Sequence, residues 1–108
     1  MIKVEVNPGV CGLQTRIKVK QTGGMRVRVE IESQCPNIED LAAELNDVDA
    51  YRECFKTSDR SPILDLASRH CRHFGCPVPM ALIKGIEAAV GVRKASDVHI
   101  LFSEESDA

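Results

Sequence analysis

Residues 13–31, LQTRIKVKQTGGMRVRVEI, decide the fold. Along both halves of this stretch, mostly apolar side chains alternate with polar or charged ones. Alternation with a period of two is typical of a β-strand with one buried and one exposed face. The inward positions are Leu13, Thr15, Ile17 and Val19 in the first half and Met25, Val27, Val29 and Ile31 in the second. Thr22, Gly23 and Gly24 turn the chain between them, so the stretch predicts an antiparallel hairpin.

The turn of this hairpin has to keep both inward sets on one face of the sheet. A two-residue loop would set an inward residue opposite an outward one, because side chains alternate along each strand. We therefore expect a loop with an odd number of residues, or a β-bulge, with Gly24 in the left-handed conformation.

Further strands and helices flank the hairpin. Residues 2–6 alternate in the same way, and residues 97–102 predict a short last strand. Apolar residues at helical spacing predict four helices, over residues 36–45, 49–56, 62–74 and 77–90. The fold class is α+β: an antiparallel three- to four-stranded sheet with helices packed on one face, in a single domain over residues 1–108.

Two of these helices carry specific expectations about their buried sides. In the helix over residues 49–56 we expect Tyr51 and Phe55 to face inward. We expect Ser61 and Pro62 to cap the next helix. Its apolar side is formed by Ile63, Leu66, Ala67, His70, Cys71 and Phe74.

Composition argues against several classes of function. The chain holds 14 Lys and Arg against 16 Asp and Glu, with one Tyr and three Phe, which argues against nucleic-acid binding. No apolar run approaches the roughly 18 residues of a membrane span, and the N-terminus lacks the features of a signal peptide. We therefore expect a cytoplasmic protein that binds neither nucleic acid nor membrane and keeps its five cysteines reduced.

Three cysteines lie in loops or at helix starts, where a chemical role is more natural than packing. Cys76 precedes Pro77, and we expect it to be the N-cap of the last helix; Cys35 precedes Pro36 at another helix start. A sulfur at either place faces unpaired amides and the positive end of a helix dipole, which favour thiolate. Cys11 precedes the hairpin and Cys35 follows it, so both are expected at the same edge of the sheet.

The other cysteines and two histidines complete the set of candidates. Cys54 and Cys71 lie at predicted helical positions, and we assign them to packing, since free cysteine is among the most buried residue types. His73, in the last turn before Gly75, and His70, on the apolar side of the same helix, are candidate additional metal ligands.

The order of elements and thiols resembles the IscU and NifU N-terminal iron-sulfur scaffold family. The resemblance implies that Cys11, followed by Gly12, Cys35 after the hairpin and Cys76 at the late helix hold an iron-sulfur cluster. The family has an Asp two residues after its first cysteine and a His directly before its third. In this chain the corresponding positions are Leu13 and Gly75.

A second resemblance is local to residues 76–79, Cys-Pro-Val-Pro. This run resembles the Cys-Pro-x-Pro motif of TusA-like sulfur carriers. The resemblance implies a persulfide on Cys76 at the N-terminus of a helix.

Our leading hypothesis is a thiol site of Cys11, Cys35 and Cys76 that binds an iron-sulfur cluster or zinc, with His73 or His70 as an additional ligand. Such a protein would be a scaffold or carrier in sulfur or metal transfer between protein partners, rather than an enzyme. Two alternatives stay open. One is a non-catalytic protein-interaction module with structural cysteines, and the other is a sulfur carrier that uses Cys76 alone.

Overall fold

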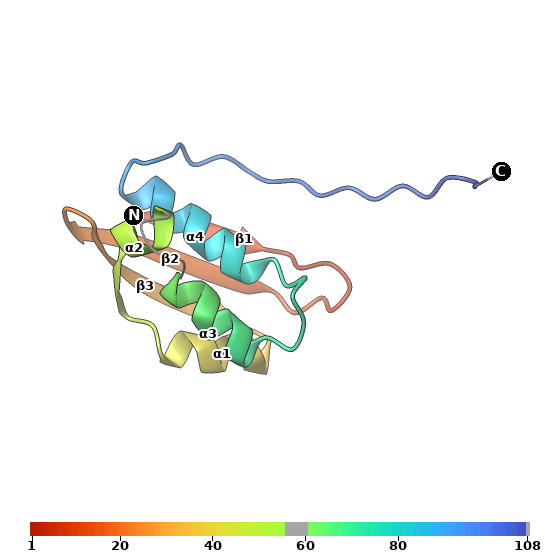
Figure 1. The fold of residues 1–108 in the computed structure, drawn as a ribbon, viewed down its shortest axis with the longest axis horizontal. Coiled ribbons are helices and arrows are strands. Elements are labelled where there is room, and N and C mark those ends of the chain that lie inside the picture. The colour runs from red at the N-terminus through yellow and green to blue at the C-terminus, as the bar shows by residue number, and fades with distance from the viewer. Residues whose placement is uncertain (56–60, 108) are drawn as a thin grey trace.

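The computed structural model describes residues 1–55 and 61–107 and confirms the α+β class (Figure 1). Four strands form one antiparallel sheet in the order β1-β2-β3-β4. They are β1 (Ile2–Val6), β2 (Thr15–Gly23), β3 (Arg26–Ser33) and β4 (Asp47–Asp49). The outermost strands are β1 on one side and β4 on the other.

Four helices cover one face of this sheet (Figure 1). They are α1 (Pro36–Ala43), α2 (Ala50–Cys54), α3 (Pro62–His70) and α4 (Val78–Ala89). The core joins inward strand residues such as Ile17 and Val19 to Leu82 and Ile86 of α4, all fully buried. No helix in the described parts of the chain is long and apolar enough to cross a membrane.

A β-bulge closes the central hairpin, as predicted. β2 and β3 pair in regular register as far as Gln21 opposite Val27, and the register then shifts between Gln21 and Gly23. Gly24 takes the left-handed conformation, with φ of 56°. The shift keeps Val19 and Val27 on the same buried face, which is what the alternation of side chains requires.

α4 lies close to the sheet because residue 85 is glycine. A Cβ atom at Gly85 would come within 3.0 Å of Val4 Cγ2 and 3.4 Å of Val19 Cγ2. The helix therefore rests directly on β1 and β2.

Two side chains hold the start of α3. The N–H of Leu64 donates to Ser61 Oγ at 3.2 Å, which confirms the predicted cap. The buried Glu53 of α2 accepts hydrogen bonds from the Ser61 hydroxyl and, at 3.1 Å, from the N–H of Ile63. Glu53 thus ties α2 to the N-terminus of α3 and satisfies backbone groups that a helix start leaves unpaired.

The prediction of the last strand is wrong, because residues 97–102 form no strand. The fourth strand is β4 instead, which pairs with β3 through Val48 opposite Val27. Its three residues are too few to produce a recognisable alternation.

Two predictions about buried aromatic side chains are also wrong. Tyr51 and Phe55 are exposed and contact each other, with ring centroids 5.3 Å apart, while Ala50 and Glu53 face the core. The predicted end of that helix at Lys56 lies outside the described residues. Phe74 is fully exposed as well, because α3 ends at His70 and the helix does not continue to Phe74.

Candidate thiol site

Cys71 and Cys76 lie at the two ends of the segment that joins α3 to α4. Cys71 is the C-cap of α3, and its N–H donates to the carbonyl of Ala67 at 2.8 Å. Its backbone is extended, with ψ of 133°, so the helix stops there. The N-cap of α4 is Pro77, not Cys76 as predicted, and Cys76 is the residue before it.

The thiols of Cys71 and Cys76 lie near enough to each other to interact. The two side chains share a hydrogen bond, and Cys71 also responds to the charge of Cys76. Burial, then the charge of Cys76, this hydrogen bond and the charge of Cys35 raise the pKa of the Cys71 thiol from 9.0 to about 11. A hydrogen bond that raises the pKa of Cys71 is one that stabilises its protonated form.

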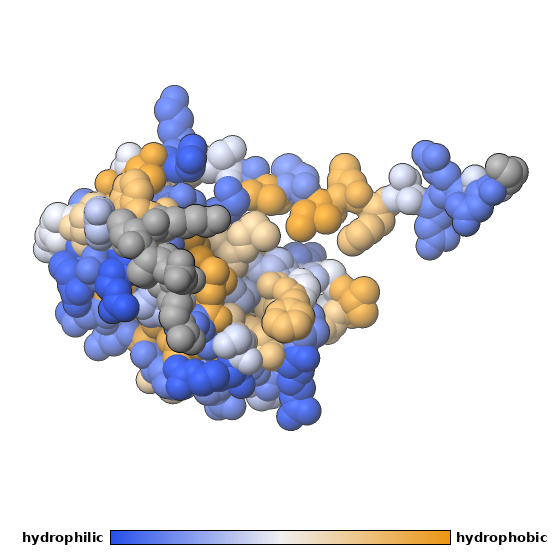
Figure 2. All heavy atoms as spheres, in the orientation of Figure 1, coloured by the Kyte–Doolittle hydropathy of each residue, from blue (hydrophilic) through white to orange (hydrophobic). Residues whose placement is uncertain are grey.

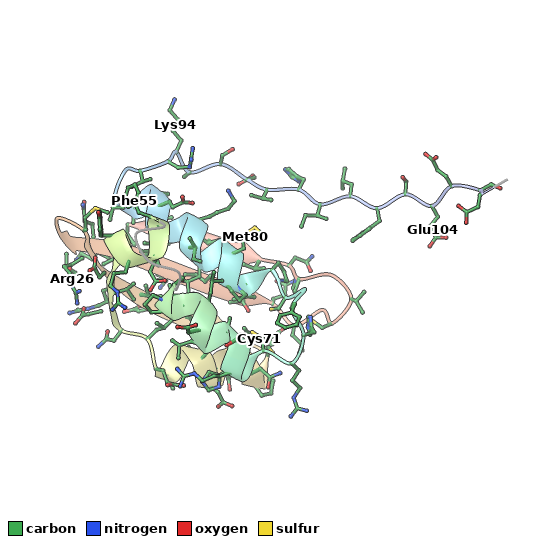
Figure 3. The ribbon with its side chains drawn as sticks, viewed as in Figure 1. Arg26, Phe55, Cys71, Met80, Lys94 and Glu104 are labelled. Atoms are coloured by element: carbon green, nitrogen blue, oxygen red, sulfur yellow. The ribbon has the colours of Figure 1, made fainter. Side chains whose placement is uncertain are left out.

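Cys35 is the third thiol at this place. It is the N-cap of α1, at the helix start predicted for it, and its N–H donates to Ser33 Oγ at 3.0 Å. Ser33 in turn shares a hydrogen bond of 2.7 Å with the hydroxyl of the buried Thr15. Because Cys35 acts electrostatically on Cys71, we define Cys35, Cys71 and Cys76 as the thiol cluster. Figure 3 marks its place by Cys71.

Cys11 lies in the loop between β1 and β2 and is exposed. The loop is shaped by Gly9 and Gly12, with φ of 92° and 66°, and the N–H of Gly12 donates to the carbonyl of Gly9 at 2.9 Å. This loop lies at the same end of the molecule as the α3–α4 segment (Figure 1). The groups that act on Cys71 are Cys76 and Cys35, so Cys11 is not part of the cluster as defined.

The two candidate histidines differ in what surrounds them. His70 bonds to the carboxylate of Glu44, between α3 and the C-cap of α1, and Arg69 lies 3.8 Å from the same carboxylate. The imidazole of His70 is therefore already bonded to the Glu44 carboxylate, in a contact that joins α3 to the end of α1. His73 is exposed in the segment between Cys71 and Cys76.

Among residues 1–55 and 61–107, no group of three or more His, Cys, Asp or Glu side chains is arranged to hold a metal ion. The cluster suits a soft metal by its chemistry, since thiolates are the preferred ligands of zinc and of iron-sulfur clusters. Two of its thiols lie near each other and the third lies close by, but the three are not arranged as the ligands of a metal ion.

Cys54 lies elsewhere and packs against the core, as predicted. Burial, followed by the charges of Glu87 and Glu53, raises the pKa of its thiol to about 11. A protonated, packed thiol of this kind is chemically inert.

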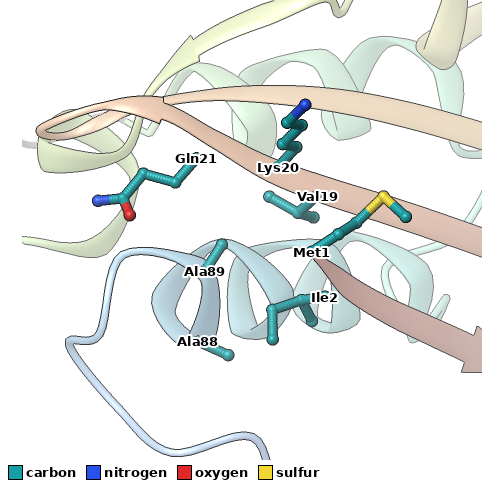
Figure 4. A pocket seen from close by; sticks show the side chains of 7 residues that line it. All are labelled: Met1, Ile2, Val19, Lys20, Gln21, Ala88 and Ala89. Atoms are coloured by element: carbon teal, nitrogen blue, oxygen red, sulfur yellow. The ribbon is translucent and has the colours of Figure 1, made fainter.

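A hollow of about 290 Å³ lies away from the cluster, between the start of β1 and the end of α4 (Figure 4). It is lined by Met1, Ile2, Val19, Lys20, Gln21, Ala88 and Ala89. These side chains include no thiol, imidazole or carboxylate, so we place no metal or thiol chemistry there.

Apolar side chains are exposed in the two loops at the end of the molecule that holds the cluster. Phe74 and Val10 are fully accessible, at 103% and 108%, and Met80 of α4 is half exposed. Figure 2 shows orange side chains at this end and along the C-terminal tail. Exposed apolar side chains beside a reactive group are typical of a surface that binds another protein.

The sequence model of one family, described as a family of unknown function, DUF6951, matches residues 2–102. No curated protein matches the chain, and no solved structure matches it. The resemblances to iron-sulfur scaffolds and to sulfur carriers therefore stay predictions.

Proposed function

The chain belongs to DUF6951, a family of unknown function, and from its thiol cluster we propose that it is a small cytoplasmic sulfur carrier that holds sulfur on Cys76. The contact between the Cys71 thiol and the Cys76 sulfur carries the proposal. It supplies a nucleophile and a neutral hydrogen-bond donor side by side, in a partly exposed segment between two helices.

Cys76 would accept sulfur by a displacement at a persulfide. Its thiolate attacks the terminal sulfur of a donor persulfide, the bond between the donor's two sulfurs breaks, and the donor leaves as a thiolate. Cys76 then carries the persulfide. Cys76 immediately precedes Pro77, the N-cap of α4, so the carried sulfur would lie near the start of that helix.

Cys71 would hold the acceptor sulfur in place and preserve the carried sulfur. If Cys71 lost its proton, its thiolate would attack the inner sulfur of the Cys76 persulfide, form a Cys71–Cys76 disulfide and expel hydrosulfide. A pKa of about 11 keeps Cys71 protonated at neutral pH, so this discharge is slow. Cys71 is therefore a positioning residue in this proposal.

A sulfur carrier has to meet a donor and an acceptor, and the exposed loop residues Phe74 and Val10 provide a contact surface for protein partners. Partners in sulfur transfer therefore fit this end of the molecule better than nucleic acid or membrane.

Binding of an iron-sulfur cluster or zinc is the second candidate function, and the position of Cys35 near the bonded pair favours it. Cys35, Cys71 and Cys76 would supply three thiolates, with the exposed His73 or a partner as the fourth ligand. This ligand set differs from the sequence prediction, because Cys71 replaces Cys11. The third reading, an interaction module with structural cysteines, predicts thiols that neither load sulfur nor take up metal.

The test loads the reduced full-length chain with cysteine persulfide and locates the added sulfur by peptide mass spectrometry. We expect one added sulfur, on Cys76, in the native chain and none in Cys76→Ser. Cys11→Ser is the matched control at an exposed thiol, and it should load as the native chain does.

Two results would overturn the proposal. Equal loading of all exposed thiols would remove the special role of Cys76. Stoichiometric zinc or iron in protein purified without oxygen, lost in Cys76→Ser, would favour metal binding instead.

A further inference from the structure

The C-terminal tail exposes a run of apolar side chains. Residues 97–102 have no regular secondary structure, and the segment runs away from the body of the molecule (Figure 1). Ile100, Leu101 and Phe102 are 64%, 90% and 94% exposed. Contiguous exposed apolar side chains mark sites that bind another surface.

The sheet of the same molecule has an open edge at β1. β1 pairs with β2 on one side, and within the described residues no strand pairs with its other side. Ile2 and Val4 are only partly buried there, whereas Ile17 and Val19 on β2 are fully buried. The inner layer of the sheet is therefore incomplete at this edge, and its unpaired backbone groups can template another strand.

The tail segment matches this edge in length and pattern. Val98, Ile100 and Phe102 alternate with Asp97, His99 and Leu101, so three apolar side chains share one face of an extended strand. Six extended residues span about 20 Å and the five residues of β1 about 17 Å. A strand formed by residues 97–102 would thus cover β1 along its whole length.

Charge complements the fit on the outer face of the sheet. Lys3 of β1 lies directly opposite Lys18, whereas Glu5, the other outward residue of β1, lies opposite Arg16. Like charges at such positions are destabilising. The tail after Lys94 carries only acidic groups besides His99, and a strand of residues 97–102 at the β1 edge would place Asp97 on the same outer face as Lys3. These groups are Asp97, Glu104, Glu105 and Asp107.

We propose that residues 97–102 add as a fifth strand to the β1 edge of a second copy of this chain, in a reciprocal exchange between two protomers. Each chain holds both a tail and an open β1 edge. In a two-fold symmetric dimer, the tail of each protomer would therefore pair with the β1 edge of the other.

The chain's own edge is the weaker site for the tail. α4 ends beside Ile2, since Ile2, Ala88 and Ala89 line one hollow, so a tail laid on its own β1 would run parallel to it. Parallel pairing is slightly less stable than antiparallel pairing, which a second copy is free to adopt.

Sedimentation of the reduced full-length chain over a range of concentrations tests this, together with amide hydrogen exchange of the tail. Reductant excludes dimers linked through the exposed Cys11. We expect a dimer of the 11.9 kDa chain, with slow exchange in residues 98–102. Ile100→Asp buries a charge at the new strand and should weaken dimerisation by at least about 100-fold. Leu64→Asp, a change at a similarly exposed apolar residue on α3 (52% against 64%), should leave the dimer intact.

Three outcomes would overturn the proposal. A monomer with slowly exchanging tail amides would place the tail on its own chain. A monomer with rapidly exchanging tail amides would leave the tail free for a different protein. A dimer that persists in Ile100→Asp would also overturn it, because its interface would lie elsewhere.

Discussion

Cys71 should behave as an unusually weak acid, and its rate of alkylation measures this directly. Burial and Cys76 raise its pKa from 9.0 to about 11. At neutral pH a rise of about two units leaves about 100-fold less thiolate. The more basic thiolate is intrinsically more reactive by roughly 6- to 10-fold, because nucleophilicity rises with pKa at a Brønsted slope of about 0.4 to 0.5. The net expectation is alkylation about 10- to 15-fold slower than that of an unhindered, unperturbed thiol.

The assay follows alkylation of each cysteine by iodoacetamide with peptide mass spectrometry, at a series of pH values on the folded chain. The rate at Cys71 should still rise about tenfold per pH unit between about pH 9 and 10, where an unperturbed thiol levels off. Cys76→Ala removes the hydrogen bond and the charge of Cys76 but neither the burial nor the charge of Cys35, so the midpoint should move down toward 9.0 without reaching it. The exposed Cys11 reports on reagent access within the same molecule, and circular dichroism confirms the fold at each pH.

A rate at Cys71 that levels off near pH 9 in the native chain would refute the raised pKa. A high midpoint that does not change in Cys76→Ala would leave burial and the charge of Cys35 as its causes. That second result would remove the thiol–thiol contact on which the proposed function depends.

Three further predictions concern stability. Gly85→Ala places a Cβ 3.0 Å from Val4, so overpacking of about 1–3 kcal/mol should outweigh a helix-propensity gain of about 1 kcal/mol. Urea unfolding should show the loss in Gly85→Ala but not in Gly23→Ala, where a Cβ meets nothing within 4 Å; equal stabilities would contradict the packing. Glu53→Ala leaves the start of α3 without its acceptor and should lower the free energy of unfolding by about 1–3 kcal/mol, and a neutral effect would show that water replaces the carboxylate. That free energy should also fall as pH rises from about 9 to about 11, because the two thiols with a folded pKa near 11 lose protons first in the unfolded chain; a flat profile would contradict this.

Alternation of side chains was enough to predict the three long strands and the bulge between Gln21 and Gly23. It failed at β4, where three residues carry no period, and at residues 97–102, where the pattern of a strand is present without a neighbouring strand in the described chain. An alternating pattern shows that a segment can form a strand. Whether it does depends on whether the fold places another strand beside it.

Cys71 packs against the core, as predicted, but the same limit explains why its approach to Cys76 was not predicted. Helical periodicity extended the apolar side of α3 through Cys71 to Phe74, which made Cys71 a packing residue. The extended backbone at Cys71 ends that period, and the chain then returns to bring Cys76 into contact with it. The available signal was Gly75 together with Pro77, which mark a turn between the two cysteines.

The most direct test of the account is to identify the first disulfide that forms when the reduced chain meets a limiting amount of oxidant. Two thiols already joined by a hydrogen bond need only a small movement to bond covalently. Peptide mapping should therefore find Cys71 linked to Cys76 before any other pair. A first disulfide between Cys11 and Cys35, or a mixture of pairs, would contradict a thiol cluster centred on Cys71 and Cys76.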